Sequence, residues 1–312
     1  MMVKNFSLDS KDGHRIFAKK WLVENKQPKA IVQIAHGMAE HKERYDSFAK
    51  FLNREGCDVY ANDHRGHGET AGNIENLGYF AEDEGWSKVI ADMNQLTTII
   101  KEENPNIPVI LFGHSMGSFL TRGYIQAYGT DVSAVILCGT GGSQGILGDI
   151  AVLLAKLEVN RLGKRNRSKV MDKLLFGSFN KAFKPNRTGY DWLTRDEKQV
   201  DKYIKDKYCG EIATAGFYYD LLKGIKEINK KGNMQKTPKK LSMLIISGDN
   251  DPVGGNTKGV MEVYNSYRKL GMENISYKFY ENSRHEILNE INKEEVYNDI
   301  ARWIKNLFEV NL

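Results

Sequence analysis

The sequence contains few cysteines and no long apolar run near its N-terminus. Only Cys57, Cys138 and Cys209 occur among the 312 residues. Because they are odd in number and far apart, they argue against a disulfide framework and a cysteine-ligated metal site, and favour a reducing compartment. No N-terminal segment suits secretion or membrane crossing, so we expect a soluble, cytoplasmic protein. No glycine-rich loop has the spacing of a nucleotide motif, and we expect no nucleic-acid partner.

Short apolar runs alternate along the chain with segments suited to helices. The expected strands are residues 31–35, 58–62, 109–113, 134–138, 243–247 and 276–280, with an N-terminal edge strand within residues 1–12. The expected helices lie near residues 44–55, 86–103, 118–128, 256–270 and 294–308. This alternation predicts an α/β fold with a mostly parallel sheet covered by helices on both faces. Between residues 143 and 238 no strand-like run occurs, which predicts a helical cap inserted into a core of residues 1–142 and 239–312.

A serine lies where one predicted strand meets the next helix. Ser115 is the centre of Gly113-His114-Ser115-Met116-Gly117, which follows the run 109–112 and precedes a helical segment. In a tight strand-to-helix turn the serine adopts a strained conformation, and small neighbours are needed because side chains there would collide with adjacent backbone. The pattern predicts a nucleophilic serine whose hydroxyl is held where a substrate reaches it.

Such a serine needs a base, and the base needs a partner that fixes its tautomer. In this architecture the acid and the histidine follow the serine in that order. His285 is the only histidine after Ser115, and it lies in a loop after a predicted strand. Two acids, Asp249 and Asp251, follow the preceding strand; we favour Asp251 because Asp249 directly follows Gly248 and suits the turn. The alternative is that both aspartates only shape a turn or cap a helix.

Attack on a carbonyl also requires two N–H groups that hold the developing oxyanion. The backbone of Met116 supplies one, directly after the serine. Met38 follows the first buried strand and Gly37, and we expect its backbone to supply the other. His36 is expected to brace this loop rather than to act as a base.

Several separated elements together resemble one enzyme family. The motifs at residues 36–41, 63–68 and 113–117, with Asp251 and His285, are similar to those of the monoacylglycerol lipase and lysophospholipase branch of the α/β-hydrolases, which is grouped with the S33 serine aminopeptidases. The resemblance implies an eight-stranded sheet with a helical cap. It also implies that Ser115, Asp251 and His285 form the catalytic triad.

The same resemblance assigns further residues. Met38 and Met116 would form the oxyanion hole, and Glu40 and Arg44 match positions that bind a glycerol headgroup. Two departures are visible: Met38 replaces a smaller residue and would narrow the acyl entrance, and Thr70 replaces a serine after the motif at 63–68. That motif is expected to brace its loop.

The cap carries most of the positive charge of the chain. Residues 143–238 contain 20 Lys and Arg against 11 Asp and Glu, a net charge of +9 in a chain of +5. Basic residues in the run 161–169 suit the phosphates of lipid headgroups, although a solvated loop would look the same. A neighbouring stretch would line an acyl channel, contact a membrane surface transiently, or simply be core: Ile150, Val152, Leu153, Leu154 and Leu157.

These patterns predict a serine hydrolase that cleaves lipid-type carboxylic esters, monoacylglycerol or lysophospholipid, through an acyl-enzyme. No metal or organic cofactor is expected to take part. Three alternatives stay open: a small-ester esterase, an aminopeptidase and a non-enzymatic binding module. The basic cap argues against the peptidase, which needs acidic groups for a substrate amine. The complete set of expected catalytic residues argues against the binding module.

Overall fold

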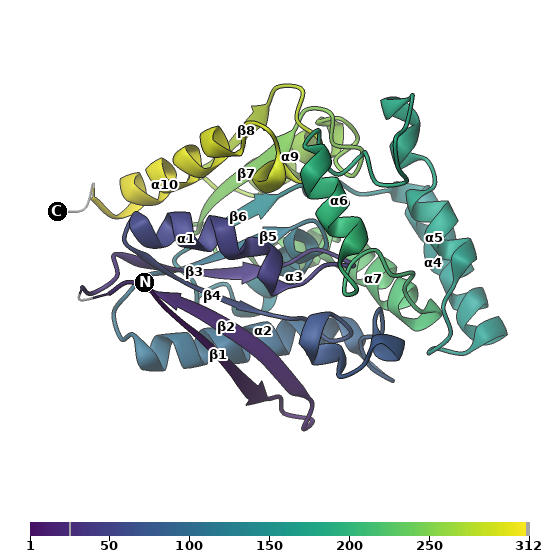
Figure 1. Ribbon diagram of the computed structural model, residues 1–312, viewed down its shortest axis with the longest axis horizontal. Coiled ribbons are helices and arrows are strands. Elements are labelled where there is room, and N and C mark those ends of the chain that lie inside the picture. Colours follow the sequence, from purple (N-terminus) through teal and green to yellow (C-terminus); the bar gives the residue numbers. More distant parts are fainter. Residues whose placement is uncertain (25, 310–312) are drawn as a thin grey trace.

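An eight-stranded sheet forms the centre of the computed structural model, which describes residues 1–24 and 26–309 (Figure 1). The strand order is β1-β2-β4-β3-β5-β6-β7-β8. β1 pairs antiparallel with β2 and β2 with β4, whereas all pairs from β4 to β8 are parallel. The bounds are β1 Met2–Asp9, β2 Arg15–Leu22, β3 Ala30–Ala35, β4 Cys57–Asn62, β5 Val109–His114, β6 Ala134–Cys138, β7 Ser242–Gly248 and β8 Ile275–Tyr280.

Helices cover both faces of this sheet, which explains why β3 to β6 are buried along their whole length. Alternate strand residues form two separate cores. Val32 and Ile34 of β3 face the core shared with α1 (Asp46–Arg54) and α10 (Lys293–Glu309). Ile31 of the same strand faces the other core, which is shared with α2 (Gly85–Glu103), α3 (Met116–Tyr128) and α9 (Lys258–Lys269).

The predicted mostly parallel, helix-covered sheet is confirmed, and the predicted segments agree with the observed elements to within about two residues. β2 has no counterpart among the predicted segments. Its buried residues Ile16, Ala18 and Trp21 are not evenly spaced, so the strand lacks the strict alternation by which half-buried strands are found. The N-terminal strand β1 lies at the edge of the sheet, as expected.

The segment between β6 and β7 contains helices and no strand of the sheet. Its helices are α4 (Gly145–Leu162), α5 (Lys169–Phe176), α6 (Glu197–Lys205), α7 (Ala215–Ile228) and α8 (Lys231–Met234), with the short η4 (Phe179–Phe183). Figure 1 shows these helices along one side of the sheet. We keep the name cap for residues 143–238. Short 3-10 turns in the core are η1 (Lys42–Tyr45), η2 (Gly68–Ala71), η3 (Ile74–Asn76) and η5 (Ile287–Asn289).

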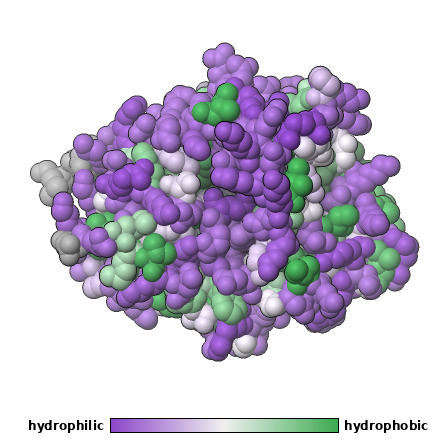
Figure 2. All heavy atoms as spheres, viewed as in Figure 1, coloured by the Kyte–Doolittle hydropathy of each residue, from purple (hydrophilic) through white to green (hydrophobic). Residues whose placement is uncertain are grey.

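Part of the cap surface is apolar. We define the cap patch as the exposed large apolar side chains of α4 and α5: Ile146, Leu147, Ile150, Leu153, Leu154, Leu157, Val170 and Leu174. In Figure 2, hydrophobic residues are visible at the surface between hydrophilic ones in the region of these helices. The core alternative for this stretch is therefore wrong. Within the described residues, every helix is too short or too polar to cross a membrane.

Most basic residues of the run 161–169 form ion pairs with acidic side chains of the same chain. Arg161 pairs with Glu158, and Lys164 pairs with Asp83. Two further arginines of the run, Arg165 and Arg167, also pair with acidic side chains. The run therefore carries few uncompensated charges.

Candidate active site

Ser115 stands between β5 and α3 in a backbone conformation that few side chains adopt. Its φ is 52° and its ψ is −118°, a strained geometry that costs about 1–3 kcal/mol. Glycines make the turn feasible: a Cβ on Gly113 would lie 2.3 Å from the Gly117 carbonyl oxygen, and one on Gly117 would lie 2.0 Å from the Ala35 carbonyl oxygen. The turn leaves Ser115 partly exposed although its flanking residues are buried.

The structure brings His285 and Asp251 together. His285 Nδ1 lies 2.9 Å from both carboxylate oxygens of Asp251, and both side chains are buried. Burial alone would raise the pKa of Asp251, but His285 and the N–H of Val253 outweigh it and hold the pKa below its ordinary value. Asp251 therefore stays ionised and accepts a hydrogen bond from Nδ1–H, which leaves Nε2 as the nitrogen that can accept a proton. Among the described residues, the Asp249 carboxylate accepts a hydrogen bond only from the Asn250 side chain, within the turn.

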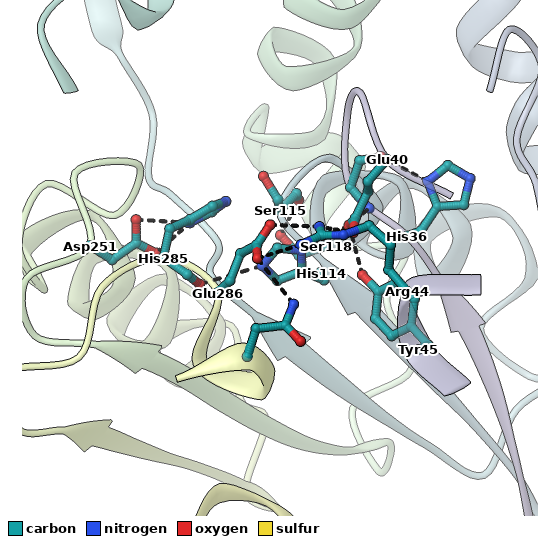
Figure 3. Close-up of polar contacts among 12 residues, drawn as sticks. His36, Glu40, Arg44, Tyr45, His114, Ser115, Ser118, Asp251, His285 and Glu286 are labelled. Atoms are coloured by element: carbon teal, nitrogen blue, oxygen red, sulfur yellow. Dashed lines mark hydrogen bonds and ion pairs between the residues drawn. The ribbon is translucent and has the colours of Figure 1, made fainter. Parts of the chain in front are cut away.

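His285 lies next to Ser115. The Ser115 N–H donates to the Cys138 carbonyl (2.9 Å), and a Cβ on the next residue, Gly139, would lie 3.0 Å from His285 Cε1. In Figure 3 the His285 ring lies between Asp251 and Ser115. Among the described residues no hydrogen bond joins the Ser115 hydroxyl to His285. Such a bond often tightens only when substrate binds.

The cap also contacts His285. The ring of Trp192 lies over the imidazole, with ring centroids 5.2 Å apart. The backbone N–H of His285 donates to the Trp192 carbonyl (3.4 Å), and that of Glu286 donates to the Leu193 carbonyl (2.7 Å). Sequence reasoning missed Gly139 and Trp192, because neither belongs to a motif and only the fold brings them to His285.

The backbone N–H groups of Met38 and Met116, both near Ser115, have no acceptor among the described residues. Met116 begins α3, so its N–H lacks an intrahelical partner. The loop bearing Met38 approaches the serine closely, since a Cβ on Gly37 would lie 3.3 Å from Ser115 Cβ. Both predicted oxyanion donors are thus free to bind an acceptor.

A buried charged cluster connects the loops around this site (Figure 3). Glu40 Oε1 accepts from the Gly37 N–H (2.5 Å) and lies 3.2 Å from His114 Nδ1, while Glu40 Oε2 accepts from Arg44 (2.8 Å). Arg44 also donates twice to Glu286, at 2.7 Å each. The cluster therefore links the Met38 loop, the end of β5 and the His285 loop.

His114 faces a hydrogen-bond acceptor at each ring nitrogen in this cluster. Its Nδ1 faces the Glu40 carboxylate, and its Nε2 lies 3.4 Å from the His285 carbonyl oxygen. Because both neighbours are acceptors, the arrangement suits the doubly protonated ring. Burial lowers the pKa of His114, but Glu40 outweighs it and the pKa is raised overall. In its doubly protonated form, His114 together with Arg44 would balance the charges of Glu40 and Glu286.

Glu40 and Arg44 were expected to bind a headgroup, yet the structure directs their polar atoms inward. Both Glu40 oxygens accept from protein donors, including the Tyr45 hydroxyl (2.8 Å). A headgroup would have to displace these partners, so headgroup binding stays a prediction without support from the contacts. Sequence reasoning did not identify Glu286 or His114 as members of this cluster.

The loops predicted to brace the site do make internal contacts. His36 Nε2 accepts from the His64 N–H (2.9 Å). Asp63 accepts from both the N–H and the ammonium of Lys42 (2.9 and 2.7 Å), and Arg65 pairs with Asp92 (2.7 Å). These contacts agree with a bracing role for His36 and for the motif at 63–68.

Comparison with known protein families identifies the family of the chain. The family described as "Serine aminopeptidase, S33" matches residues 26–292, which is most of the chain. The chain belongs to this family. Its fold is that of the α/β-hydrolases, and the resemblance inferred from the sequence motifs is confirmed.

Individual members of the S33 family and its structural relatives resemble the chain over nearly its full length. The monoacylglycerol lipase of Mycolicibacterium smegmatis is 28% identical over 94% of this chain and 93% of that protein. Among solved structures, a thermostable carboxyl esterase from Bacillus coagulans in complex with glycerol is 28% identical, has a TM-score of 0.91 and is covered over 99% of both chains. Monoglyceride lipase from Saccharomyces cerevisiae, at 19% identity, a TM-score of 0.75 and coverage of 98% and 95%, shares the fold.

Proposed function

We propose that this S33 family member is a serine hydrolase that cleaves lipid-type carboxylic esters, monoacylglycerol or lysophospholipid, through an acyl-enzyme. The observation that carries the proposal is the His285 imidazole, held through Nδ1 by a buried Asp251 carboxylate beside the strained Ser115 turn. Such a pairing prepares a general base for a serine hydroxyl.

In the proposed reaction, Ser115 Oγ attacks the ester carbonyl carbon while its proton passes to His285 Nε2. The Met38 and Met116 N–H groups hold the oxyanion, and Asp251 stabilises the imidazolium. The C–O bond of the ester then breaks, and the departing alcohol takes the proton from His285. Water repeats these steps on the acyl-serine, so that the acid is released and Ser115 regains its proton.

We propose a positioning role for Glu40 and Arg44 in place of headgroup binding. Glu40 holds the Gly37 N–H, one residue before the Met38 oxyanion donor. Arg44 ties Glu40 to Glu286, one residue after His285. The cluster thereby fixes the oxyanion loop relative to the base.

Two observations support a lipid-type ester. Relatives of similar length are named as monoacylglycerol and monoglyceride lipases, and the cap patch is apolar and exposed. We propose that this patch contacts a lipid surface transiently. The three thiols are free, which fits the reducing, cytoplasmic setting that we propose. A small-ester esterase is the second candidate, because the structural alignment with the carboxyl esterase of known structure covers 99% of this chain and 99% of that chain.

A series of p-nitrophenyl esters from acetate to palmitate tests the proposal, with monoacylglycerol and lysophosphatidylcholine alongside. Wild type should prefer medium or long acyl chains, and Ser115→Ala should lower kcat by several orders of magnitude. Ser133→Ala, which changes an exposed serine, is the matched control and should retain full activity. Activity confined to acetate would favour the small-ester esterase, and activity unchanged in Ser115→Ala would refute the mechanism.

A further inference from the structure

Three side chains with different metal-binding chemistry meet where the cap contacts the core. The ligand atoms of His41, Asp206 and Cys209 all lie within 4.8 Å of one another. His41 belongs to the core loop that carries Met38, and its side chain is buried. Asp206 directly follows α6 of the cap, and Cys209 lies three residues further along the same turn.

Backbone hydrogen bonds hold this turn in place on the core loop. The Cys209 N–H donates to the Asp206 carbonyl (3.0 Å), which places both side chains on one turn. The next N–H, that of Gly210, donates to the Ala39 carbonyl of the core loop (3.0 Å). The three side chains are therefore brought together by the fold and not by chance rotamers of flexible loops.

The Asp206 carboxylate is oriented as a metal-bound carboxylate would be. Its Oδ1 accepts from the Tyr208 N–H (2.9 Å), while its Oδ2 lies 2.8 Å from His41 Nε2. Hydrogen bonds of this kind to the outer oxygen orient ligating carboxylates in metal sites. The remaining oxygen and the imidazole nitrogen point at each other, so an ion inserted between them would replace one hydrogen bond by two coordinate bonds.

We propose that His41, Asp206 and Cys209 form a binding site for a zinc-like transition-metal ion that joins the cap to the core. An imidazole, a carboxylate and a thiolate form a mixed donor set that suits Zn²⁺, whereas Mg²⁺ and Ca²⁺ prefer oxygen ligands alone. On binding, the thiol proton passes to water and a metal–sulfur bond forms. The Nε2 proton that His41 shares with Asp206 moves through solvent to Nδ1, so that His41 ligates through unprotonated Nε2. Water takes the fourth position.

Access and local charge fit this site. His41 and Asp206 line a cavity of about 440 Å³, so an ion from solvent can reach these two ligands. Arg44 is close enough to act electrostatically on Cys209. Because Arg44 pairs with Glu40 and Glu286, its positive charge is compensated and would repel a bound cation less. The wide spacing of the cysteines argued against a cysteine-ligated metal site, but this cluster needs only one cysteine, and its partners come from distant positions in the sequence.

The site is independent of ester hydrolysis, so its test does not use activity. We would titrate the full chain, freed of metal, with Co²⁺ and record the near-ultraviolet thiolate-to-cobalt charge-transfer band, then add Zn²⁺. The band should appear in wild type, disappear as Zn²⁺ displaces Co²⁺, and be absent in Cys209→Ser. Cys57→Ala, which removes a different buried thiol, is the matched control and should keep the band.

A second variant tests the imidazole ligand. Loss of an outer-shell partner lowers metal affinity roughly 10–100-fold, so His41→Gln should lower Co²⁺ affinity by at least that factor while circular dichroism shows an unchanged fold. Zn²⁺ should also raise the thermal midpoint of wild type but not of Cys209→Ser. Absence of the band in wild type, or a band that persists in Cys209→Ser, would overturn the proposal.

Discussion

Replacing Glu40 by glutamine tests whether this side chain positions the site or binds substrate. All four partners of the Glu40 carboxylate are donors: Gly37 N–H, Tyr45 O–H, His114 Nδ1–H and the Arg44 guanidinium. A glutamine amide would direct its own N–H₂ at some of these donors and leave Arg44 and His114 undercompensated. Removing one partner of a buried ion pair costs about 3–5 kcal/mol, so we expect the free energy of unfolding to fall by about that amount.

The effect on catalysis should be smaller than complete loss of an oxyanion donor, which costs about 10²–10³ in kcat. In Glu40→Gln the Met38 N–H remains but its loop loses its anchor, so we expect kcat to fall roughly 10–100-fold. The fall should be similar for p-nitrophenyl butyrate, which has no glycerol, and for monoacylglycerol. KM should change little for either substrate, because the lost contact is within the enzyme.

The matched control is Glu43→Gln, because that side chain is 42% exposed and pairs with Lys19 at the surface. It should keep the wild-type kcat, KM and thermal midpoint. Steady-state kinetics on both substrates and a thermal melt of each variant complete the experiment. A higher KM for monoacylglycerol alone, with normal turnover of p-nitrophenyl butyrate, would show that Glu40 is a headgroup ligand and refute the positioning role.

Three further predictions concern other parts of the molecule. Gly139→Ala, at a φ of +61° and with its Cβ 3.0 Å from His285 Cε1, should lower kcat at least tenfold by displacing the imidazole while the chain still folds, as kinetics and a melt would show. Burial raises the pKa of Asp220 to about 6, so its contribution to stability falls as pH rises from about 4 through 6; Asp220→Asn should therefore add about 1–2 kcal/mol at pH 8 and nothing at pH 4 in denaturant titrations. Changing Leu153 and Leu157 of the cap patch together to Ser should weaken sedimentation with phosphatidylcholine vesicles without affecting p-nitrophenyl acetate hydrolysis; unchanged sedimentation would exclude the patch as a lipid contact.

The parts of the site that belong to local motifs could be predicted from the sequence. The serine turn is recognisable because its glycines are required by backbone contacts within a few residues or with the adjacent strand. Asp251 and His285 could be located because each follows a strand of strong apolar character, and parallel strands bring their carboxyl ends to one edge.

The positioning groups could not be predicted in the same way. Glu40 lies in a motif, but whether its carboxylate faces substrate or protein depends on His114 and Glu286. These two residues lie 74 and 246 positions after Glu40 in the sequence. Burial of the stretch around Ile150 was equally undetermined, because an apolar run looks the same in a core and on an exposed helix. β2 was missed because its buried residues follow no simple period.

The contacts between the cap and the His285 loop divide the cap into two parts with different freedom to change. The backbone of Trp192 and Leu193 is hydrogen-bonded to His285 and Glu286, so this short stretch is structurally part of the His285 loop. The exposed residues of α4 and α5 make no such bonds to that loop. Evolution or protein engineering can therefore vary the two helices without disturbing the His285 loop, whereas exchange of the entire cap would also remove the indole and the backbone carbonyls that contact His285 and Glu286.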